Sequence, residues 1–582
     1  MDEELPHPLS EGDAMARVLR GLTGAQYEAV TSEASPLCVI AGAGSGKTRV
    51  LTHRIAKRVL DGSADPERTM VLTFTRKAAG ELRSRLGHLG VPHSVTAGTF
   101  HALAYAQLRR RWADMSVRPP AVCDSPARVI RPLIAQATGR PPDPAMTYAV
   151  SNEISWARAR LVDPDRYGLE ASRAGRQSID PELVSRVYGE YTTAKKRKGL
   201  VDLDDLMEHC AIALETDSTF SSAQRWLFRH FFVDEMQDLN PAQWRLLRGW
   251  LADRDDVFVV GDPHQAIYSW NGADPTLLNR ITELMPDMTV LRLDDNHRCA
   301  PEVVDVARSV LGGAAAESIR SAREDLTGQV EVRDFEDDER ESNALARWLR
   351  DHHAPGRSWS SFAVLARTNA RLEPVAQALA RAGIPFVRRE QAATGSEVSA
   401  LAALRSLPKN TPLRQALASI STEEEDIEWL AREVDSICSE FPEADVGQLL
   451  STRALGAADA GDSYKKTKDA VQVLTFHRAK GLEWTSVAVV GLESGMVPIA
   501  HAVRSEALDE ERRLLYVALT RAEREIWCSW AEKRTTEDRS WNCEPSPYLS
   551  AIRLAARVVA DCDPVPASTH IAELRSKLTV AG

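Results

Sequence analysis

The chain has 582 residues, a length that predicts about three to four domains because one hydrophobic core rarely grows so large. Hydrophobic residues make up 43% and charged residues 27%, which excludes a disordered or fibrous class. The sequence has no apolar run of roughly 18 residues, as a membrane helix needs, and its acidic start lacks the apolar centre of a secretory signal. Eight scattered cysteines without a CxxC pair argue against zinc and disulfide frameworks, so we expect a cytoplasmic protein.

Charge is unevenly distributed along the chain. Its net value of −11, from 72 basic and 83 acidic residues, argues against a uniform electrostatic attraction to nucleic acid. Residues 101–200 nevertheless hold 17 Lys and Arg against 10 Asp and Glu, whereas residues 386–469 hold 10 against 15. A polyanion would therefore bind local basic patches, although each basic run can equally be a solvated helix face.

Short apolar runs in the first half of the chain predict strands. Continuous runs bounded by turn or polar residues are typical of a parallel sheet that is buried on both faces. The section 108–214 is helical and rich in arginine, and we interpret it as an insertion into a first α/β domain that covers residues 1–107 and 215–290. The predicted strands of this domain are 37–40, 70–72, 231–233 and 257–260.

A glycine-rich turn follows the first predicted strand. Glycines let backbone N–H groups converge on phosphate oxygens, and the N-terminus of a following helix adds its positive dipole end. The turn predicts a P-loop for ATP, in which Lys47 reaches the β- and γ-phosphates and the Thr48 hydroxyl ligates Mg²⁺. The competing interpretation is an ordinary strand-to-helix turn. The candidate nucleotide-binding residues here are Ala41, Gly42, Ala43, Gly44, Ser45, Gly46, Lys47, Thr48 and Arg49.

Two carboxylates, Asp234 and Glu235, end the predicted strand 231–233. A P-loop needs such a partner, because Asp234 would hold Mg²⁺ through its water shell and Glu235 would polarise the attacking water. Alone, an apolar run that ends in Asp-Glu is weak evidence for such a site, since helix caps often have the same sequence. Together with the P-loop it predicts hydrolysis of a nucleoside triphosphate.

A second set of apolar runs predicts a second parallel-sheet domain over residues 291–385 and 470–550. An acidic, helical, Ala- and Leu-rich segment interrupts it at 386–469. The residues from Glu544 on are expected to be loosely packed, with residues 551–582 as a C-terminal tail that holds an amphipathic helix at 571–578. The expected fold class is α/β, with two tandem domains of parallel sheets flanked by helices, and with helical insertions. The predicted strands of the second domain are 329–332, 362–365, 471–474 and 487–490.

The order of further motifs resembles that of the UvrD/Rep/PcrA-like DNA helicases of superfamily 1A. Besides the P-loop, the segments that carry this resemblance are residues 22–26, 72–79, 98–102, 234–238 in the family's DExQD form, 260–270, 296–298, 474–484 and 511–522. The resemblance implies two RecA-like domains, 1A and 2A, with the basic insertion as subdomain 1B. The 84 residues of 386–469 would then be a shortened 2B, because the family usually has a much larger one.

The resemblance also implies roles around the nucleotide. Gln26 would read the adenine, Glu483 would contact the ribose, and Gln265 would sense the γ-phosphate. His297 stands where the family usually has a tyrosine that stacks on the adenine.

Two arginines, Arg298 and Arg521, lie outside the predicted P-loop domain. Positive donors on a second domain suit arginine fingers, which contribute on the order of 10³-fold or more in rate. ATP binding would then close the cleft between the domains and hydrolysis would open it.

Three aromatic residues, Phe74, Tyr268 and Trp270, are candidates for stacking on single-stranded DNA. Such stacking contributes about 1–3 kcal/mol per base and tolerates any sequence, as a translocating enzyme requires. Each of them can instead be a core residue. By resemblance, further phosphate or sugar contacts are expected at Thr99, His101, Arg367, Asn369 and His477.

The sequence therefore predicts an ATP- and Mg²⁺-dependent DNA helicase that acts on single strands and single/double-strand junctions. The resemblance implies 3′→5′ movement, a nucleoid location in the cytoplasm, and repair-protein partners in DNA repair or replication restart. Two alternatives stay open. One is a translocase that needs a partner to unwind duplex, which the short 2B segment favours. The other is a regulator without motor activity, switched by ATP.

Overall fold

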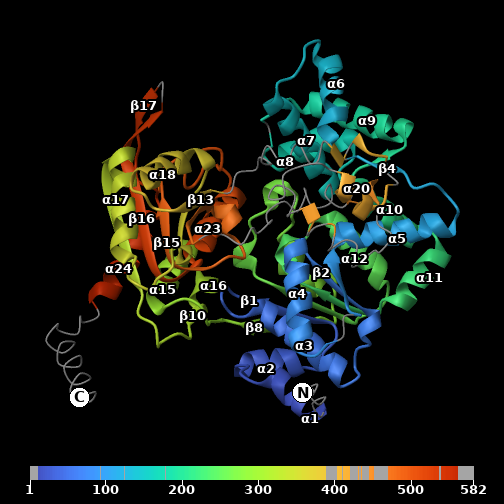
Figure 1. Cartoon of the computed structure of the whole chain (residues 1–582), viewed down its shortest axis with the longest axis horizontal. Helices are drawn as coiled ribbons and strands as arrows, with labels where there is room; N and C mark the ends of the chain where they lie inside the picture. The colour runs from blue at the N-terminus through green and yellow to red at the C-terminus, as the bar shows by residue number, and fades with distance from the viewer. Residues whose placement is uncertain are drawn as a thin grey trace. The chain divides into compact units, whose positions relative to one another are not determined.

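The computed structural model describes residues 11–388 except 92–93, 124 and 177, parts of 403–450, and residues 469–561 except 537–538. These residues form two compact α/β units, which confirms the expected fold class (Figure 1). The first unit holds residues 11–40 and 47–292 with the described parts of 403–450, and the second holds 41–46, 293–388 and 469–561. None of the described helices is both long and apolar enough to span a membrane.

The first unit is built on a six-stranded sheet in the order β3-β2-β6-β7-β1-β8. The pairs β3–β2, β2–β6, β6–β7 and β7–β1 are parallel, and all four predicted strands are confirmed. β3 and β8 were not predicted. The strands are β1 Leu37–Ala41, β2 Thr69–Thr73, β3 Thr96–Thr99, β6 His230–Val233, β7 Val257–Gly261 and β8 Thr289–Leu293.

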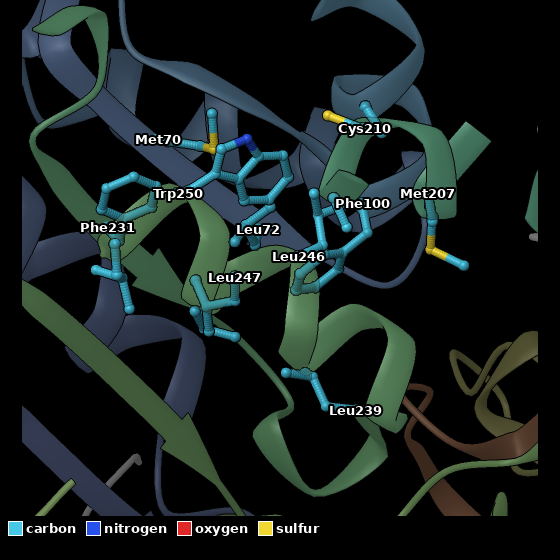
Figure 2. Packing of buried hydrophobic residues seen from close by; sticks show 14 of the residues in the cluster. Met70, Leu72, Phe100, Met207, Cys210, Phe231, Leu239, Leu246, Leu247 and Trp250 are labelled. Atoms are coloured by element: carbon cyan, nitrogen blue, oxygen red, sulfur yellow. The ribbon is translucent and has the colours of Figure 1, made fainter. Parts of the chain in front are cut away.

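One face of this sheet is covered by α5 (Phe100–Asp114), α10 (Leu203–Thr216) and α12 (Pro241–Leu251), which pack with the strands in a large hydrophobic core. The rings of Phe100 and Trp250 stack there at 6.1 Å, and Trp250 donates to the Gln107 side chain at 2.8 Å. Figure 2 shows these rings among other hydrophobic side chains of the core. The expected limits of the insertion, at 107/108 and 214/215, fall inside α5 and α10, because both helices continue to pack on this core.

The remaining helices near this sheet include α2, which is tied to α3 by a buried arginine. Arg54 of α3 donates to the carbonyls of Ala29, Ser32 and Ala34 at 2.8–3.0 Å, and its guanidinium lies 5.2 Å from the ring centre of Phe258. It thereby satisfies carbonyls at the C-terminal end of α2, which have no partner within that helix. The helices are α1 Glu11–Leu19, α2 Gly24–Thr31, α3 Lys47–Leu60 and α4 Arg76–His88.

The basic insertion is helical, as expected, and four buried charged side chains fix it. Lys195 and Arg158 each contact Asp202 and Asp205, with Lys195 Nζ at 2.6 Å and Arg158 Nη2 at 2.6 Å from Asp205. Buried charges are stable only when paired, so these contacts hold α7 and α9 against α10. The elements of this region are β4 Ala121–Val122, α6 Pro126–Thr138, α7 Pro144–Ala159, α8 Tyr167–Arg173, α9 Pro181–Lys198 and β5 Leu200–Val201, and α11 Ser218–Leu227 follows α10.

The second unit is built on a sheet in the order β11-β16-β15-β12-β14-β13, with β17 paired antiparallel to β16. The other pairs are parallel, and the four predicted strands are confirmed. β13 belongs to this sheet, so the interrupting segment begins after it and not at 386. The strands are β11 Gln329–Asp337, β12 Phe362–Ala366, β13 Phe386–Arg388, β14 Val471–Thr475, β15 Trp484–Val490, β16 Ala522–Thr536 and β17 Arg539–Asn542.

The helices of the second unit include one that the sequence did not predict. α24 packs against α15, so the expectation of a loose tail is wrong for residues 551–556. The helix expected at 571–578 and most of the segment 386–469 lie outside the described residues. The helices of this unit are α15 Pro301–Leu311, α17 Asp338–His352, α18 Asn369–Arg381, α23 Ser505–Leu519 and α24 Leu549–Asp561.

Candidate nucleotide and DNA sites

The glycine-rich turn joins β1 to α3, which begins at Lys47. Gly44 and Gly46 have φ angles of +69° and +88°, a region that L side chains rarely adopt. A Cβ atom on Gly44 would also lie 2.5 Å from the Asn296 side-chain oxygen. The Ser45 hydroxyl closes the turn by donating to the Gly42 carbonyl at 2.8 Å. Glycine is therefore required at position 44 both for conformation and for space.

A buried carboxylate, Asp262, organises the ends of β6 and β7. Its side chain is 1% exposed, lies 3.7 Å from Lys47 Nζ, and accepts hydrogen bonds from Gln265 Nε2 at 2.7 Å and the His264 N–H at 2.9 Å. The Asp262 N–H donates at 2.8 Å to the Gln237 side chain. One carboxylate thus connects the lysine of the glycine-rich turn with the residues that follow two neighbouring strands.

The same network reaches the predicted catalytic carboxylate. Gln237 is fully buried and donates its amide to Glu235, while Asp234 Oδ1 accepts the Glu235 N–H at 3.0 Å. Glu235 has φ of +52°, a left-handed conformation that costs of order 1–3 kcal/mol in a non-glycine residue. Strain of this kind, supported by buried partners, is typical of functional positions.

Sequence reasoning missed Asp262 and Gln237 as site residues. Both follow an apolar strand in a short polar segment, the same signal that identified Asp234 and Glu235. Their roles depend on the order β6-β7-β1, which brings the ends of these strands together and which the sequence does not reveal.

The Gln26 side chain is nearly buried and has a structural role in the helix that carries it. Gln26 and Thr23 form a reciprocal capping box at the start of α2, with distances of 3.2 and 3.4 Å. Arg49, in the first turn of α3, donates to the Arg20 carbonyl at 3.4 Å. Arg54 of α3 also donates to the Ala29 carbonyl of α2. Gln26, the expected adenine reader on α2, is therefore fixed relative to α3.

In the second unit, three predicted nucleotide residues come together. Arg298 Nε lies 2.6 Å from Glu483, and Arg298 Nη1 donates to the Thr520 carbonyl at 3.5 Å. Arg521 is buried and donates to the carbonyls of Val517 and Leu482 at 2.9 and 3.2 Å. Both arginines are therefore held in place by partners within their own unit.

The candidate base-stacking residues divide into two kinds. Phe74 is half-buried, packs against the large core and has its ring 6.5 Å from that of Phe100, as a core residue would. Trp270 is 47% exposed and lies edge-on to Tyr268 at 6.4 Å. Arg176 of the insertion donates to the Trp270 carbonyl at 3.1 Å. Trp270 is thus held by its backbone while its ring faces solvent.

Two residues expected to contact the DNA backbone lie at the start of α5. Thr99 is the N-cap of α5, because its hydroxyl accepts the Ala102 N–H at 3.3 Å. Burial lowers the pKa of His101 to about 4, so its imidazole is neutral at physiological pH. His101 can therefore offer a hydrogen bond to a phosphate, but no positive charge.

Three further predicted DNA contacts lie in the second unit. Arg367, directly after β12, forms an ion pair with Glu511, with Nη2 at 2.7 Å from the carboxylate. Burial, and secondarily the charge of Arg367, lowers the pKa of His477 to about 3. Asn369 is the first residue of α18, and its carbonyl accepts from Arg388 at 3.2 Å.

Oxygen donors suited to Mg²⁺ are present in the first unit. The Thr48 hydroxyl and the buried Asp234 carboxylate are the hard ligands that this ion prefers. Among the described residues, no group of three or more His, Cys, Asp or Glu side chains could hold a metal ion. Mg²⁺ is usually bound by one or two protein oxygens together with waters and phosphates, so these two residues fit it.

Comparison with known proteins identifies the family. Residues 22–286 match the UvrD/REP helicase N-terminal domain, and residues 291–404 and 399–533 match the UvrD-like helicase C-terminal domain. The chain belongs to the UvrD-like helicase family. The resemblance seen in the sequence motifs is therefore confirmed, and the protein is an ATP-dependent DNA helicase of this family.

Three relatives show the extent of the similarity. The ATP-dependent DNA helicase UvrD2 of Mycobacterium tuberculosis is 35% identical to this UvrD-like helicase over 95% of the chain and 84% of its own length. The ATP-dependent DNA helicase PcrA of Bacillus subtilis and DNA helicase II of Escherichia coli are each 27% identical over 92% of the chain, covering 86% and 88% of their lengths.

Replacing Gly44 by alanine should lower kcat/KM for ATP on the order of 10²-fold, because the strained turn and the Asn296 contact would displace the phosphate-binding backbone. Gly80→Ala in α4 is the matched control. A Cβ there meets no atom within 4 Å, so this variant should keep the parent kcat/KM. Steady-state ATP hydrolysis measures both, and a Gly44→Ala variant with parent kinetics would contradict the P-loop assignment.

The lowered pKa of His477 predicts a loss of stability in acid. The unfolded chain binds this proton below about pH 6.5 and the folded chain only near pH 3, so stability falls as the pH drops through this window, by up to about 1.4 kcal/mol per pH unit. A His477→Gln variant, unfolded by urea at pH 7.5, 6.0 and 5.0, should lose less stability in acid than the parent. Parallel pH profiles would show that His477 is protonated in the folded protein.

Proposed function

We propose that this UvrD-like helicase moves 3′→5′ along single-stranded DNA and couples this movement to ATP hydrolysis in the first unit. The observation that supports ATP hydrolysis most is the buried network of Lys47, Asp262, Gln265, Gln237 and Glu235. It fixes a phosphate-binding lysine, a γ-phosphate sensor and a strained catalytic carboxylate around one buried charge. Such pre-arrangement serves hydrolysis, which needs oriented groups, more than nucleotide binding alone.

In the proposed reaction, Lys47 and the backbone of the glycine-rich turn hold the β- and γ-phosphates. Glu235 accepts a proton from the attacking water, and Gln265 contacts the γ-phosphate. Thr48 and Asp234 would hold Mg²⁺, which neutralises the charge of the phosphates when it is bound.

We further propose that the first unit contains most of domain 1A, that the second contains domain 2A, and that ATP binding closes a cleft between the two domains. Arg298 and Arg521 would then reach the γ-phosphate as arginine fingers. This is supported by their membership of the second unit, whereas Lys47 and Glu235 belong to the first. Closure would make hydrolysis depend on the relative movement of the units, which is the basis of a motor cycle.

On the DNA side, Trp270 is the proposed stacking platform because its exposed ring stands next to Tyr268 on the segment that follows Gln265. A base stacked on Trp270 would therefore contact the same short segment that carries Gln265, the proposed γ-phosphate sensor. The proposed setting is DNA repair or replication restart in the nucleoid, with repair proteins as partners.

A second candidate function is a translocase that needs a partner to unwind duplex. The observation in its favour is the short length of the segment between Arg388, where β13 ends, and Val471, where β14 begins. This segment stands where the family resemblance implies a much larger 2B subdomain.

One experiment separates these functions: ATP turnover measured without nucleic acid, with single-stranded DNA, with duplex, and with 3′- or 5′-tailed duplex, alongside strand separation. We expect stimulation by single strands and separation of the 3′-tailed duplex only. Glu235→Gln is the control, and it should lose on the order of 10²-fold in turnover while still binding DNA, because it lacks the proton acceptor.

Other outcomes would change the proposal. Stimulation by single strands without separation of any duplex would favour the partner-dependent translocase. Separation of only the 5′-tailed duplex would contradict the direction of movement, and turnover that no DNA stimulates would contradict the motor.

A further inference from the structure

Arg367, a proposed DNA contact, is held by a buried carboxylate on another element. Both oxygens of Glu511 accept from Arg367 Nε at 3.0 and 3.1 Å, and one accepts from Nη2 at 2.7 Å. Glu511 is 5% exposed and also accepts the Ile499 N–H at 3.1 Å. The plane of the guanidinium is therefore fixed, as is typical of a bidentate pair.

This ion pair uses one edge of the guanidinium. Arginine has five N–H donors, and the terminal nitrogen Nη1 takes no part in the bond to Glu511. Since the neighbouring imidazole of His477 is neutral, Arg367 is the cationic member of this pair of proposed DNA contacts. Nη1 is thus the atom of this pair best suited to meet a phosphate.

Glu511 lies on α23, the helix that ends next to Arg521. α23 spans Ser505–Leu519, packs against the short helix η7 (Phe476–Ala479) that carries His477, and is followed directly by Thr520 and Arg521. Arg521 in turn donates to the carbonyl of Val517 in the last turn of α23. With a rise of 1.5 Å per residue, about 12 Å of helical backbone separates Glu511 from Leu519, where α23 ends two residues before Arg521.

We propose that Glu511 is a positioning residue that couples DNA binding to ATP hydrolysis, by joining the DNA contact Arg367 to the helix that directly precedes Arg521. The inference rests on the proposed function, because it takes Arg367 to meet DNA and Arg521 to meet the γ-phosphate. A phosphate that approaches Nη1 shares the charge of Arg367 with Glu511. Any shift of the guanidinium then acts through Glu511 on a rigid helix whose other end positions Arg521.

The test is Glu511→Gln, which keeps the size of the side chain and an oxygen acceptor but removes its charge. The ratio of DNA-stimulated to DNA-free ATP turnover should fall at least about fivefold, the lower range of typical coupling between sites. Binding to single-stranded oligonucleotide, measured by fluorescence anisotropy, should not weaken. Its salt dependence should steepen by up to about 0.7 in log–log slope, because Arg367 gains an uncompensated charge.

A double-mutant cycle shows whether Glu511 acts through Arg367. Arg367→Gln should lower the stimulation ratio by itself, and the double variant should lose no more than Arg367→Gln alone, since the two residues form one unit. The matched control is Asp509→Asn, two residues earlier on α23, whose contact with Arg512 is exposed. This control should keep the parent ratio.

The outcomes distinguish this inference from the proposed function. A parent protein that DNA does not stimulate would contradict the proposed function and the inference with it. A stimulated parent with an unchanged ratio in Glu511→Gln would overturn the inference alone. So would losses that multiply in the double variant, or weaker DNA binding by Glu511→Gln, because they indicate a purely structural role.

Discussion

The proposed nucleotide site of this UvrD-like helicase is built around one buried negative charge, that of Asp262. A carboxylate with 1% exposure is stable only with a cation or several donors around it, and Lys47, Gln265 and the His264 N–H provide them. Because β7 lies between β6 and β1, the segments after these strands meet at one edge of the sheet. The same charge that must be compensated for stability therefore brings the proposed catalytic groups together.

Buried ion pairs have a similar role elsewhere in the chain. Lys195 and Arg158 with Asp202 and Asp205 hold the helical insertion against α10, and Arg534 contacts Glu341 and Glu493 at the end of β16. Each of these networks joins different elements of the fold. The charges of the first network cancel, and in the second Arg371 also contacts Glu493, so that two arginines face two glutamates. Such contacts favour a defined geometry. A defined geometry is needed if a change at the proposed nucleotide site is to alter the proposed DNA contacts.

Much of the fold follows from local sequence patterns. Strands buried on both faces have continuous apolar runs, so β1, β6, β7, β12 and β15 were predictable. β16 was not, because its sequence AEREIWCSWAEKRTT mixes charged and apolar residues although the strand lies between two others. β3, with the sequence TAGT, is too short and too small in its side chains to give a signal.

The candidate site was predictable where a role follows from residue type and spacing. For the glycine-rich turn and for the pair Asp234–Glu235, a few consecutive residues are enough to predict phosphate binding and catalysis. The roles of Asp262 and Gln237 depend on which strands are neighbours, and the pairing of Arg367 with Glu511 joins residues 144 positions apart. Gln26 and Thr99 show a further limit of prediction from sequence. Helix capping and ligand binding favour the same polar residue types, so the residue type alone does not distinguish the two roles.

The most direct test of this account is the ATP turnover of an Asp262→Asn variant with saturating single-stranded DNA. Asparagine keeps the shape of the side chain but removes the charge that faces Lys47 and one of the two carboxylate acceptors. Turnover should fall on the order of 10²-fold, as misplacement of catalytic groups by about 1 Å does, with the fold retained in thermal unfolding. A folded variant that hydrolyses ATP at the parent rate would show that this buried charge does not organise the site.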